Sequence, residues 1–512
     1  MLVKTFGSAI MGVSARTITV ETSVDTGVNI FMVGLPDSAV KESHHRIETA
    51  LKSVGYRIPG KKIVINMAPA DIRKEGAAYD LTLAVGILGA SEQIRKEEIS
   101  DYIIMGELSL DGTIHPIKGI LPIAIQAKRE GFKGMVIPAQ NAKEAAIVEG
   151  IKVYGVDNIR EVIQFFDGKQ ELKQVIVNTR EEFFAQLNNY EYDFSDVKGQ
   201  ENIKRALEIA AAGGHNCILI GPPGSGKTML AKRLPTILPP LTLHEALETT
   251  KIHSVAGKLG KNTALVSVRP FRSPHHTISD AGLVGGGTFP QPGEISLAHH
   301  GVLFLDELPE FKRTALEVMR QPMEDRVVTI SRARQTINFP ASFMLIAAMN
   351  PCPCGYYNHP DQECSCGPGI VQKYLNKISG PLLDRIDLHV EVVPVPFREL
   401  SEAREGEASK DIRERVVVAR QIQHKRFENS HKTHCNAQMT SRQLHQYCKT
   451  DSASNTLLKN AMEKLNLSAR AYDRILKVSR TIADLEGKPA ILPEHVAEAI
   501  HFRSLDRETW GT

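Results

Sequence analysis

The segment Gly221-Pro222-Pro223-Gly224-Ser225-Gly226-Lys227-Thr228 has the composition and spacing of a phosphate-binding loop. An apolar run at residues 217–220 precedes it, and a helical pattern at residues 229–234 follows it. The glycines allow successive backbone N–H groups to point at phosphate oxygens, and the start of the helix adds partial positive charge. In such a loop Lys227 reaches the β- and γ-phosphates, and Thr228 ligates Mg²⁺. The segment therefore predicts a site for a nucleoside triphosphate and Mg²⁺.

Two adjacent carboxylates, Asp306 and Glu307, end the apolar run at residues 302–305. A nucleotide site needs a carboxylate to organise its metal, and we expect Asp306 to hold Mg²⁺ through the water shell of the ion. Glu307 is placed to orient and polarise the attacking water. Together with the phosphate loop, the pair indicates hydrolysis and disfavours a nucleotide-gated scaffold without turnover.

Three further side chains are candidates for contact with the reacting phosphate. Asn350 follows the apolar run at residues 343–349, so its amide would reach the γ-phosphate or the attacking water. Arg385 lies in the segment Pro381–Asp387, and Arg470 lies at the start of a helical pattern. The charge on a transferring phosphoryl group calls for such cations, supplied by the same chain or by a neighbouring subunit. The candidate catalytic residues are thus Lys227, Asp306, Glu307, Asn350, Arg385 and Arg470.

Length and composition limit what these residues can belong to. The chain has 512 residues, which suggests about three domains. Lys plus Arg number 62 against 59 Asp plus Glu, so any contact with nucleic acid must be a local patch on a chain of net charge +3. No segment has the ~18 uninterrupted apolar residues of a membrane-spanning helix, and the N-terminus lacks a signal-peptide pattern. We expect a cytoplasmic protein that does not contact membranes.

The elements that position the motifs fall into distinct parts of the chain. Alternating strand and helix patterns predict an α/β domain at residues 1–168. Residues 169–195 are polar and charged, which favours a linker with one helix. A second α/β domain at residues 196–396 carries the phosphate loop and the acidic pair, and residues 397–512 are helical in pattern, with Ser468 as an N-cap.

The nucleotide motifs together resemble the core of AAA+ ATPases in the magnesium-chelatase and MCM-helicase branch. The resemblance rests on Gly221–Thr228, Leu303–Glu307, Asn350, Leu382–Arg385 and Ser468–Arg470. It implies a parallel sheet that binds ATP and Mg²⁺, with Asn350 as sensor 1, Arg385 as an arginine finger acting on the neighbouring subunit and Arg470 as sensor 2. Such proteins form rings, so the resemblance also implies a homo-hexamer with ATP bound between subunits.

Two segments between these motifs support the same branch. The segment Arg269–Gly287 resembles its helix-2 insert. Residues 327–339 alternate as two strands around a basic tip and resemble its pre-sensor-1 hairpin, which points into the central pore of ring motors. Arg332 and Arg334 at that tip would contact a DNA backbone while ATP-driven motion moves the hairpin. An ordinary solvated hairpin is the alternative interpretation.

The N-terminal segments Val33–Ser43, Ile65–Asp71 and Gly106–Gly112 resemble the Lon-protease-like domain of the ribosomal S5 domain 2 fold. An active site of that type uses a serine nucleophile activated by a lysine. Alignment places Ala78 at the serine position and Leu121 at the lysine position, and Lys118 lies three residues away from the latter. We expect an inactive fold used for assembly or DNA contact.

Over nearly its full length the chain resembles the bacterial YifB/ComM family of magnesium-chelatase-like AAA+ proteins, which is associated with DNA branch migration during natural transformation. The resemblance implies a ring ATPase that remodels single-stranded or branched DNA, as a helicase or branch-migration motor, with recombination proteins as further partners. The alternative is a magnesium-chelatase-like motor that acts on a protein. An ATP-dependent protease is disfavoured by Ala78 and Leu121.

Four of the seven cysteines lie within fifteen consecutive positions: Cys352, Cys354, Cys364 and Cys366. In a reducing compartment such clustering indicates metal binding, and four thiolates suit a structural, tetrahedral Zn²⁺. His359, between the two cysteine pairs, is an alternative ligand. The C-x-C spacing differs from the usual C-x-x-C arm, so a loop of free thiols is the other interpretation, and a disulfide between positions i and i+2 would be strained.

Overall fold

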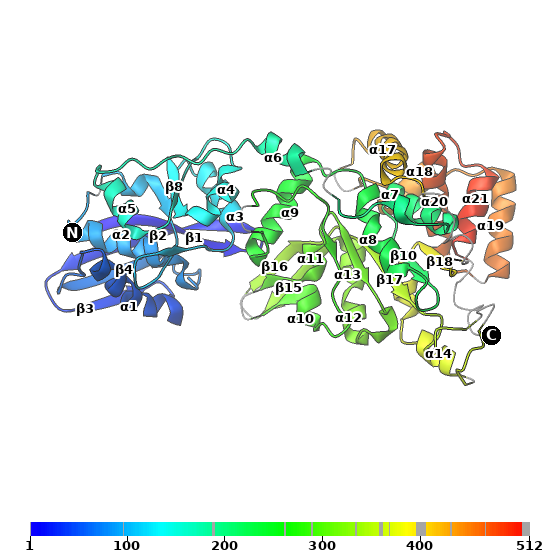
Figure 1. Cartoon of the computed structure of the whole chain (residues 1–512), viewed down its shortest axis with the longest axis horizontal. Coiled ribbons are helices and arrows are strands. Elements are labelled where there is room, and N and C mark those ends of the chain that lie inside the picture. Colours follow the sequence, from blue (N-terminus) through cyan, green and yellow to red (C-terminus); the bar gives the residue numbers. More distant parts are fainter. Residues whose placement is uncertain are drawn as a thin grey trace.

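The computed structural model describes residues 2–95, 97–186, 190–260, 263–287, 290–332, 335–357, 362–367, 369–395, 406–430, 433–465 and 467–503. The molecule is elongated, with an N-terminal α/β domain at one end, a second α/β domain in the middle and the C-terminal helices at the other end (Figure 1). No helix in the described part of the chain is long and apolar enough to cross a membrane. The α/β fold and the parallel sheet expected for the nucleotide domain are both confirmed.

The N-terminal domain is built on a seven-stranded sheet in the order β3-β4-β2-β1-β5-β8-β9. Its strands are β1 (Leu2–Met11), β2 (Ser14–Asp25), β3 (Asn29–Val33), β4 (Lys62–Ala68), β5 (Tyr102–Ile104), β8 (Gly134–Pro138) and β9 (Lys152–Val156), with a small β6–β7 ladder (Glu107–Leu108, Ile114–His115) beside it. Its helices are α1 (Ser38–Ser53), α2 (Asp80–Ala90), α3 (Ile120–Arg129), α4 (Ala139–Ala146) and α5 (Ile159–Phe166). Helices α2 and α3 both pack on the long antiparallel hairpin β1–β2. All of α2 is buried, which places this apolar helix in the domain core.

The segment expected to be a linker contains one short helix, α6 (Thr179–Gln186). The buried Phe183 of α6 packs in one cluster with Ile147 of the N-terminal domain and with Leu241 and Leu265 of the second domain. The Thr179 hydroxyl donates a hydrogen bond of 3.1 Å to the Ile147 carbonyl. This segment therefore bridges the two domains through apolar contacts.

The second α/β domain has a parallel five-stranded sheet in the order β11-β14-β17-β10-β18. Its strands are β10 (Cys217–Ile220), β11 (Phe271–Arg272), β14 (Val302–Leu305), β17 (Met344–Met349) and β18 (Leu388–Glu391). The helices of this domain are α7 (Glu201–Gly213), α8 (Lys227–Ile237), α9 (Leu243–Ala256), α10 (Asp280–Val284), α11 (Glu294–Leu297), α12 (Arg313–Val318), α13 (Arg320–Asp325), α14 (Ile370–Leu375) and α15 (Gly380–Leu383). The central strands β10, β14 and β17 are buried throughout, as expected for a parallel sheet covered on both faces.

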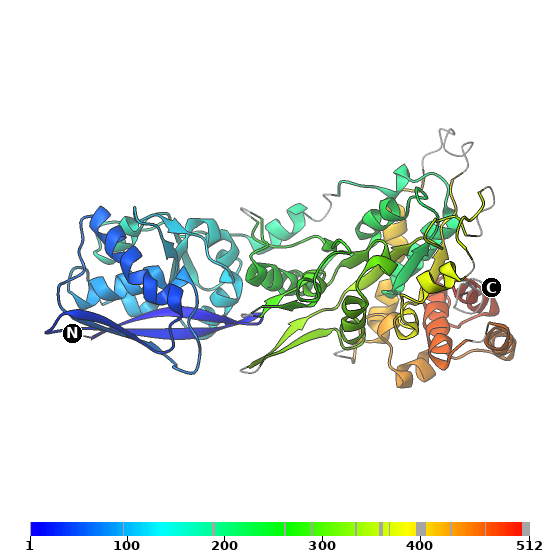
Figure 2. The ribbon, with the colours of Figure 1, turned by 90° about the horizontal axis from the view of Figure 1, so that it is seen from below.

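Two hairpins extend from the sheets and meet between the domains. The hairpin β15–β16 (Val327–Arg332, Gln335–Pro340) projects from the second domain toward the β1–β2 hairpin (Figure 2). Val13, at the β1–β2 turn, packs in the same apolar cluster as Val328 and Phe339, and a side chain at Gly12 would lie 2.9 Å from Ile337. The small ladder β12–β13 (Gly285–Gly286, Gln291–Pro292) lies beside β15.

The C-terminal region is helical: α17 (Ser409–Arg426), α18 (Ser441–Tyr447), α19 (Ser452–Lys464), α20 (Ala469–Leu485) and α21 (Pro493–His501). Ser468 caps α20, since its side chain accepts the N–H of Ala471. Helix α20 packs on α7 of the second domain, and buried hydrogen bonds join the two regions. His215, which precedes β10, contacts Asp387 Oδ2 at 3.1 Å and Thr481 Oγ1 of α20 at 2.8 Å.

Candidate nucleotide site

Strand ends bring the predicted magnesium ligands together. Because β10 and β14 run parallel on either side of β17, the loops that follow them leave the same edge of the sheet. The Thr228 hydroxyl donates a hydrogen bond of 2.6 Å to Asp306 Oδ2. Both are hard oxygen donors at an exposed position, which is the ligand chemistry that Mg²⁺ prefers when it keeps several waters. These residues therefore fit a magnesium ion bound together with phosphate.

The phosphate loop has the tight backbone that its glycines predict. Gly224 and Gly226 adopt positive φ angles of 76° and 89°, which residues with a Cβ rarely adopt. A side chain at Gly221 would lie 2.2 Å from the Val392 carbonyl, so only glycine fits there. The loop turns directly into α8, whose first residues are Lys227 and Thr228. The helix start therefore faces the position that phosphate would take.

Lys227 lies folded over this loop. Its ammonium donates to the carbonyls of Gly221 and Pro222 at 2.7 and 2.8 Å and contacts Asn350 Oδ1 at 3.2 Å. Burial lowers the pKa of Lys227, while the charge of Asp306 acts in the opposite direction. Asn350, which follows the central strand β17, is thus in contact with Lys227.

Glu307 has an unusual backbone and a partner that sequence reasoning missed. Its φ of 52° and ψ of 49° place it in the left-handed region, a strain that is typical of functional sites. Its N–H donates a hydrogen bond of 2.9 Å to Asp306 Oδ1. Its own carboxylate is more than half exposed, and His276 Nδ1 lies 3.1 Å from its Oε2. His276 belongs to the segment Arg269–Gly287 and follows β11, the strand beside β14. In the sequence, a histidine shortly after such a strand was the only indication of this contact.

The two candidate arginines lie at the amino ends of the strands, opposite the end that carries the phosphate loop. Strand β18 runs parallel to β10 with Leu388 beside Cys217, so Arg385 precedes the amino end of β18 while the phosphate loop follows the carboxyl end of β10. Arg470 lies beside this segment, with a guanidinium nitrogen 3.9 Å from Asp384 Oδ2. The sheet therefore separates both arginines from Lys227 and Asp306 of the same chain.

Arg385 is buried and paired. Its guanidinium forms an ion pair of 2.5 Å with Glu324 of α13 and donates a hydrogen bond to the Pro381 carbonyl. Side-chain exposure is 8% for Arg385 and 51% for Glu324, so only the glutamate faces solvent freely. Glu324 is a further charged residue at this position that the sequence motifs did not indicate.

Of the two candidate DNA-binding arginines, Arg332 is exposed at the end of β15. A side chain at Gly286 of the insert would lie 3.5 Å from the Arg332 guanidinium, so the predicted insert and the predicted hairpin are neighbours. Arg334 lies outside the described residues.

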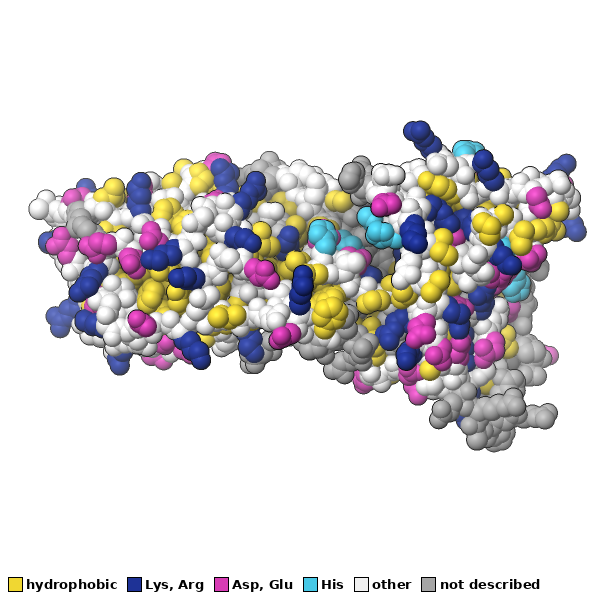
Figure 3. All heavy atoms as spheres, turned by 90° about the horizontal axis from the view of Figure 1, so that it is seen from above, with side chains coloured by type: hydrophobic (Ala, Val, Ile, Leu, Met, Phe, Trp, Pro, Cys, Tyr) yellow, Lys and Arg dark blue, Asp and Glu magenta, His cyan; other side chains and the backbone are white. Residues whose placement is uncertain are grey.

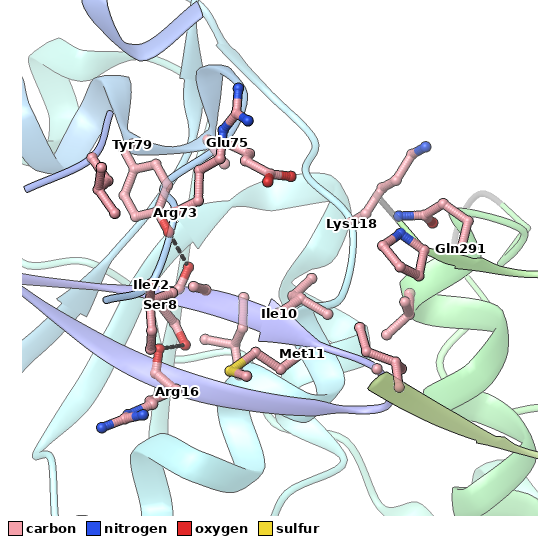
Figure 4. Close-up of a pocket in the computed structure, with 18 of the residues that line it drawn as sticks. Ser8, Ile10, Met11, Arg16, Ile72, Arg73, Glu75, Tyr79, Lys118 and Gln291 are labelled. Atoms are coloured by element: carbon pink, nitrogen blue, oxygen red, sulfur yellow. Dashed lines mark hydrogen bonds between the residues drawn. The ribbon is translucent and has the colours of Figure 1, made fainter. Parts of the chain in front are cut away.

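A cavity of about 1240 Å³ lies between the two α/β domains, at the segments that resemble a Lon-type protease site (Figure 4). Ala78 and Lys118 both line it, and burial raises the pKa of Glu75, on the same wall, to about 7. The Lys118 side chain points away from Tyr79. Leu121 is fully buried, and its N–H donates a hydrogen bond of 2.9 Å to Glu144. Neither aligned position therefore offers a nucleophile or a base.

The four clustered cysteines come together in one loop after β17. Their sulfur atoms all lie within 4.8 Å of one another, while His359 lies outside the described residues. A second group, Glu248, His299 and His300, is also close-packed. There, however, His299 Nδ1 accepts the N–H of Ser342 at 2.9 Å, so the proton of a neutral ring is on Nε2, which faces Glu248 at 3.7 Å. A protonated nitrogen cannot ligate a metal, so we interpret this group as a structural cluster in which His300 Nε2 also contacts Glu248 at 2.9 Å.

Comparisons with known proteins agree with this arrangement. Three family models match: "Magnesium chelatase, subunit ChlI" over residues 193–400, "Subunit ChlI of Mg-chelatase" over residues 20–141 and the C-terminal ChlI model over residues 406–503. The competence protein ComM of Haemophilus influenzae is 43% identical over 98% of this chain and 97% of its own length. The protein YifB of Escherichia coli is 42% identical over 98% and 96%. Lon protease 2 of Bacillus subtilis is 34% identical over 129 residues, 25% of this chain and 22% of the protease.

The parallel sheet, with its phosphate loop after β10 and polar residues after β14 and β17, defines a P-loop domain of the AAA+ type. Ahead of it lies a domain with similarity to Lon protease, and behind it a helical region. Within this class, the chain belongs to the YifB/ComM family of magnesium-chelatase-like AAA+ proteins.

Proposed function

We propose that this protein hydrolyses ATP and uses the energy to remodel DNA as a helicase or branch-migration motor. For the chemical step, Thr228 and Asp306 would hold Mg²⁺, and Lys227 and Asn350 would bind the γ-phosphate. The ion would supply electrostatic stabilisation of the phosphoryl group. Glu307, directly after Asp306, would orient the attacking water and accept its proton. The 2.6 Å contact between Thr228 and Asp306 supports this assignment.

The positions of Arg385 and Arg470 support a ring. Since the sheet separates both from the phosphate loop of their own chain, we infer that they serve a nucleotide bound to a neighbouring subunit. A head-to-tail interface repeats from one subunit to the next, and the subunits form a closed ring when the successive rotations between them add up to a full turn. We propose a homo-hexamer in which each subunit supplies Arg385 and Arg470 to the next.

The proposal that DNA is the substrate rests on the hairpin β15–β16. Arg332 is exposed on a two-stranded projection outside the catalytic sheet, which suits contact with a phosphate backbone. On the face shown in Figure 3, lysine and arginine side chains are interspersed with aspartate and glutamate, so that face is not a uniformly basic surface. A few arginines per subunit, multiplied around a ring, would therefore make the DNA contact. The similarity to a competence protein also favours DNA.

The proposal is tested by ATP turnover with and without single-stranded and branched DNA. We expect DNA to stimulate turnover, and the R332A/R334A double variant to lose stimulation while keeping its ring and its basal rate. The matched control is K128A/R129A, which removes two charges from the exposed end of α3. E307Q should lower turnover by about 10²-fold or more in all conditions. If DNA has no effect even at low salt, a magnesium-chelatase-like motor that acts on a protein becomes the better assignment.

A further inference from the structure

The cysteine loop lies directly against the phosphate loop. Gly355, within this loop, has a φ of 89°, and a side chain there would lie 2.4 Å from Cδ of Pro223. The backbone at Gly355 is thus packed on the ring of Pro223 with no intervening space. The same loop begins two residues after Asn350, so it adjoins two parts of the nucleotide site.

The sulfur atoms already have the spacing of a metal tetrathiolate. Cys352 Sγ lies 3.2 Å from Cys354 Sγ and 3.7 Å from Cys364 Sγ, and the latter two are 3.5 Å apart. A tetrahedral zinc ion with Zn–S bonds of about 2.3 Å separates its sulfurs by about 3.8 Å. All seven cysteines are free thiols, so no disulfide accounts for the short distances.

Backbone donors surround the sulfurs. The N–H of Gly355 donates to Cys352 Sγ at 3.2 Å, and backbone N–H groups of Tyr357, Tyr356, Cys366 and Cys354 are directed at Cys352, Cys354, Cys364 and Cys366 respectively. Hydrogen bonds of this kind orient the sulfur atoms, as outer-shell donors orient the ligands of a metal. Cys352 is fully buried, and the other three are partly buried.

We propose that Cys352, Cys354, Cys364 and Cys366 bind one structural Zn²⁺, and that the metal holds Gly355 against Pro223 so that the phosphate loop keeps its nucleotide-binding conformation. The ion would cross-link the two cysteine pairs and so fix the loop between them. The second part of this proposal depends on the nucleotide site proposed above, whereas the metal content does not.

The first test is metal analysis of the full chain purified in reductant without added metal. We expect about one zinc per chain, its loss in C364S/C366S, and its retention in C448A, which alters a buried cysteine elsewhere. Cobalt exchanged into the protein should show the visible bands of a tetrahedral thiolate site. Well under one zinc per chain after reconstitution with Zn²⁺, with four titratable thiols in this loop, would overturn the metal site.

The second test measures binding of a fluorescent ADP. We expect C364S/C366S and G355A to weaken binding by about fivefold or more, with zinc retained in G355A. G369A is the matched control, because Gly369 also has a positive φ, of 77°, but a Cβ added there would meet no atom within 4 Å. Unchanged affinity for ADP in the zinc-free variant would contradict the proposal that the metal supports the phosphate loop. Absence of ADP binding by the unaltered protein would refute the nucleotide site instead, whatever its zinc content.

Discussion

His276 Nδ1 lies 3.1 Å from Oε2 of Glu307, so the carboxylate expected to activate water is in contact with an imidazole. The contact arises from the sheet: β11 and β14 are parallel neighbours, and the loops that follow them leave the same edge. The segment after His276 continues into α10 and the ladder β12–β13, where Gly285 lies against Ile330 of the arginine-bearing hairpin. One continuous segment of the chain therefore contacts Glu307 at His276 and the hairpin at Gly285.

We expect His276→Ala to raise ATP turnover without DNA by about two- to fivefold, because Glu307 is then free to orient water. The ratio of DNA-stimulated to basal turnover should fall, since the basal rate is already raised. His275→Ala is the control, because it removes a ring that contacts Thr277 and packs on His276 while leaving the His276–Glu307 contact in place. A lower basal rate in His276→Ala would show that the histidine assists Glu307 rather than restraining it.

A mixture of two inactive variants tests whether Arg385 acts on a neighbouring subunit. Lys227→Ala removes the phosphate-loop cation, and Arg385→Ala leaves the loop intact but removes the arginine. In randomly mixed rings, about a quarter of the interfaces would pair an intact loop with an intact arginine. ATP turnover should therefore recover on mixing and stay absent in each variant alone. Failure to recover, with mixed rings demonstrated by differently tagged subunits, would contradict action between subunits.

Acid should destabilise the second domain through His299. Burial is the main cause that lowers the pKa of His299 to about 4, so the folded protein keeps this ring neutral at pH values where the unfolded chain protonates it. The stability that the neutral His299 ring contributes is therefore fully present above about pH 6.5. It is lost as the pH falls toward 4, by at most roughly 3.4 kcal/mol at 1.36 kcal/mol per pH unit. Urea unfolding at pH 7, 6, 5 and 4 measures this loss, and His299→Gln should flatten that part of the profile. An unchanged profile in the variant would show that other groups cause the acid sensitivity.

The N-terminal domain should not cleave peptides. Ala78 lines the cavity and offers no nucleophile, and Leu121 is fully buried, with its N–H bonded to Glu144. Incubation with casein or a fluorogenic peptide, with and without ATP, should give no cleavage above a buffer control. Cleavage that persists through purification and is abolished by a substitution in this domain, such as Lys118→Ala, would contradict the assignment.

Much of the nucleotide site can be predicted from the sequence, because its parts are local. The phosphate loop, with strand before and helix after, and the adjacent pair Asp306–Glu307 at a strand end need only short-range patterns to be recognised. Once a parallel sheet is expected, the convergence of Thr228, Asp306 and Asn350 at one edge follows. Ala78 and Leu121 likewise argue against a protease by residue type alone. The catalytic and sensor roles of these residues stay predictions.

The contacts that suggest regulation required the tertiary structure. His276 reaches Glu307, Glu324 pairs with Arg385, and Gly355 packs on Pro223, each from a different element and without a shared motif. Such pairs depend on strand order, register and the packing of loops at a sheet edge, which distant positions in one chain do not reveal. The sequence by itself determined the chemistry that each strand end can offer. Only the tertiary structure decided which side chains restrain or support that chemistry, because contact distances arise from packing across the sheet.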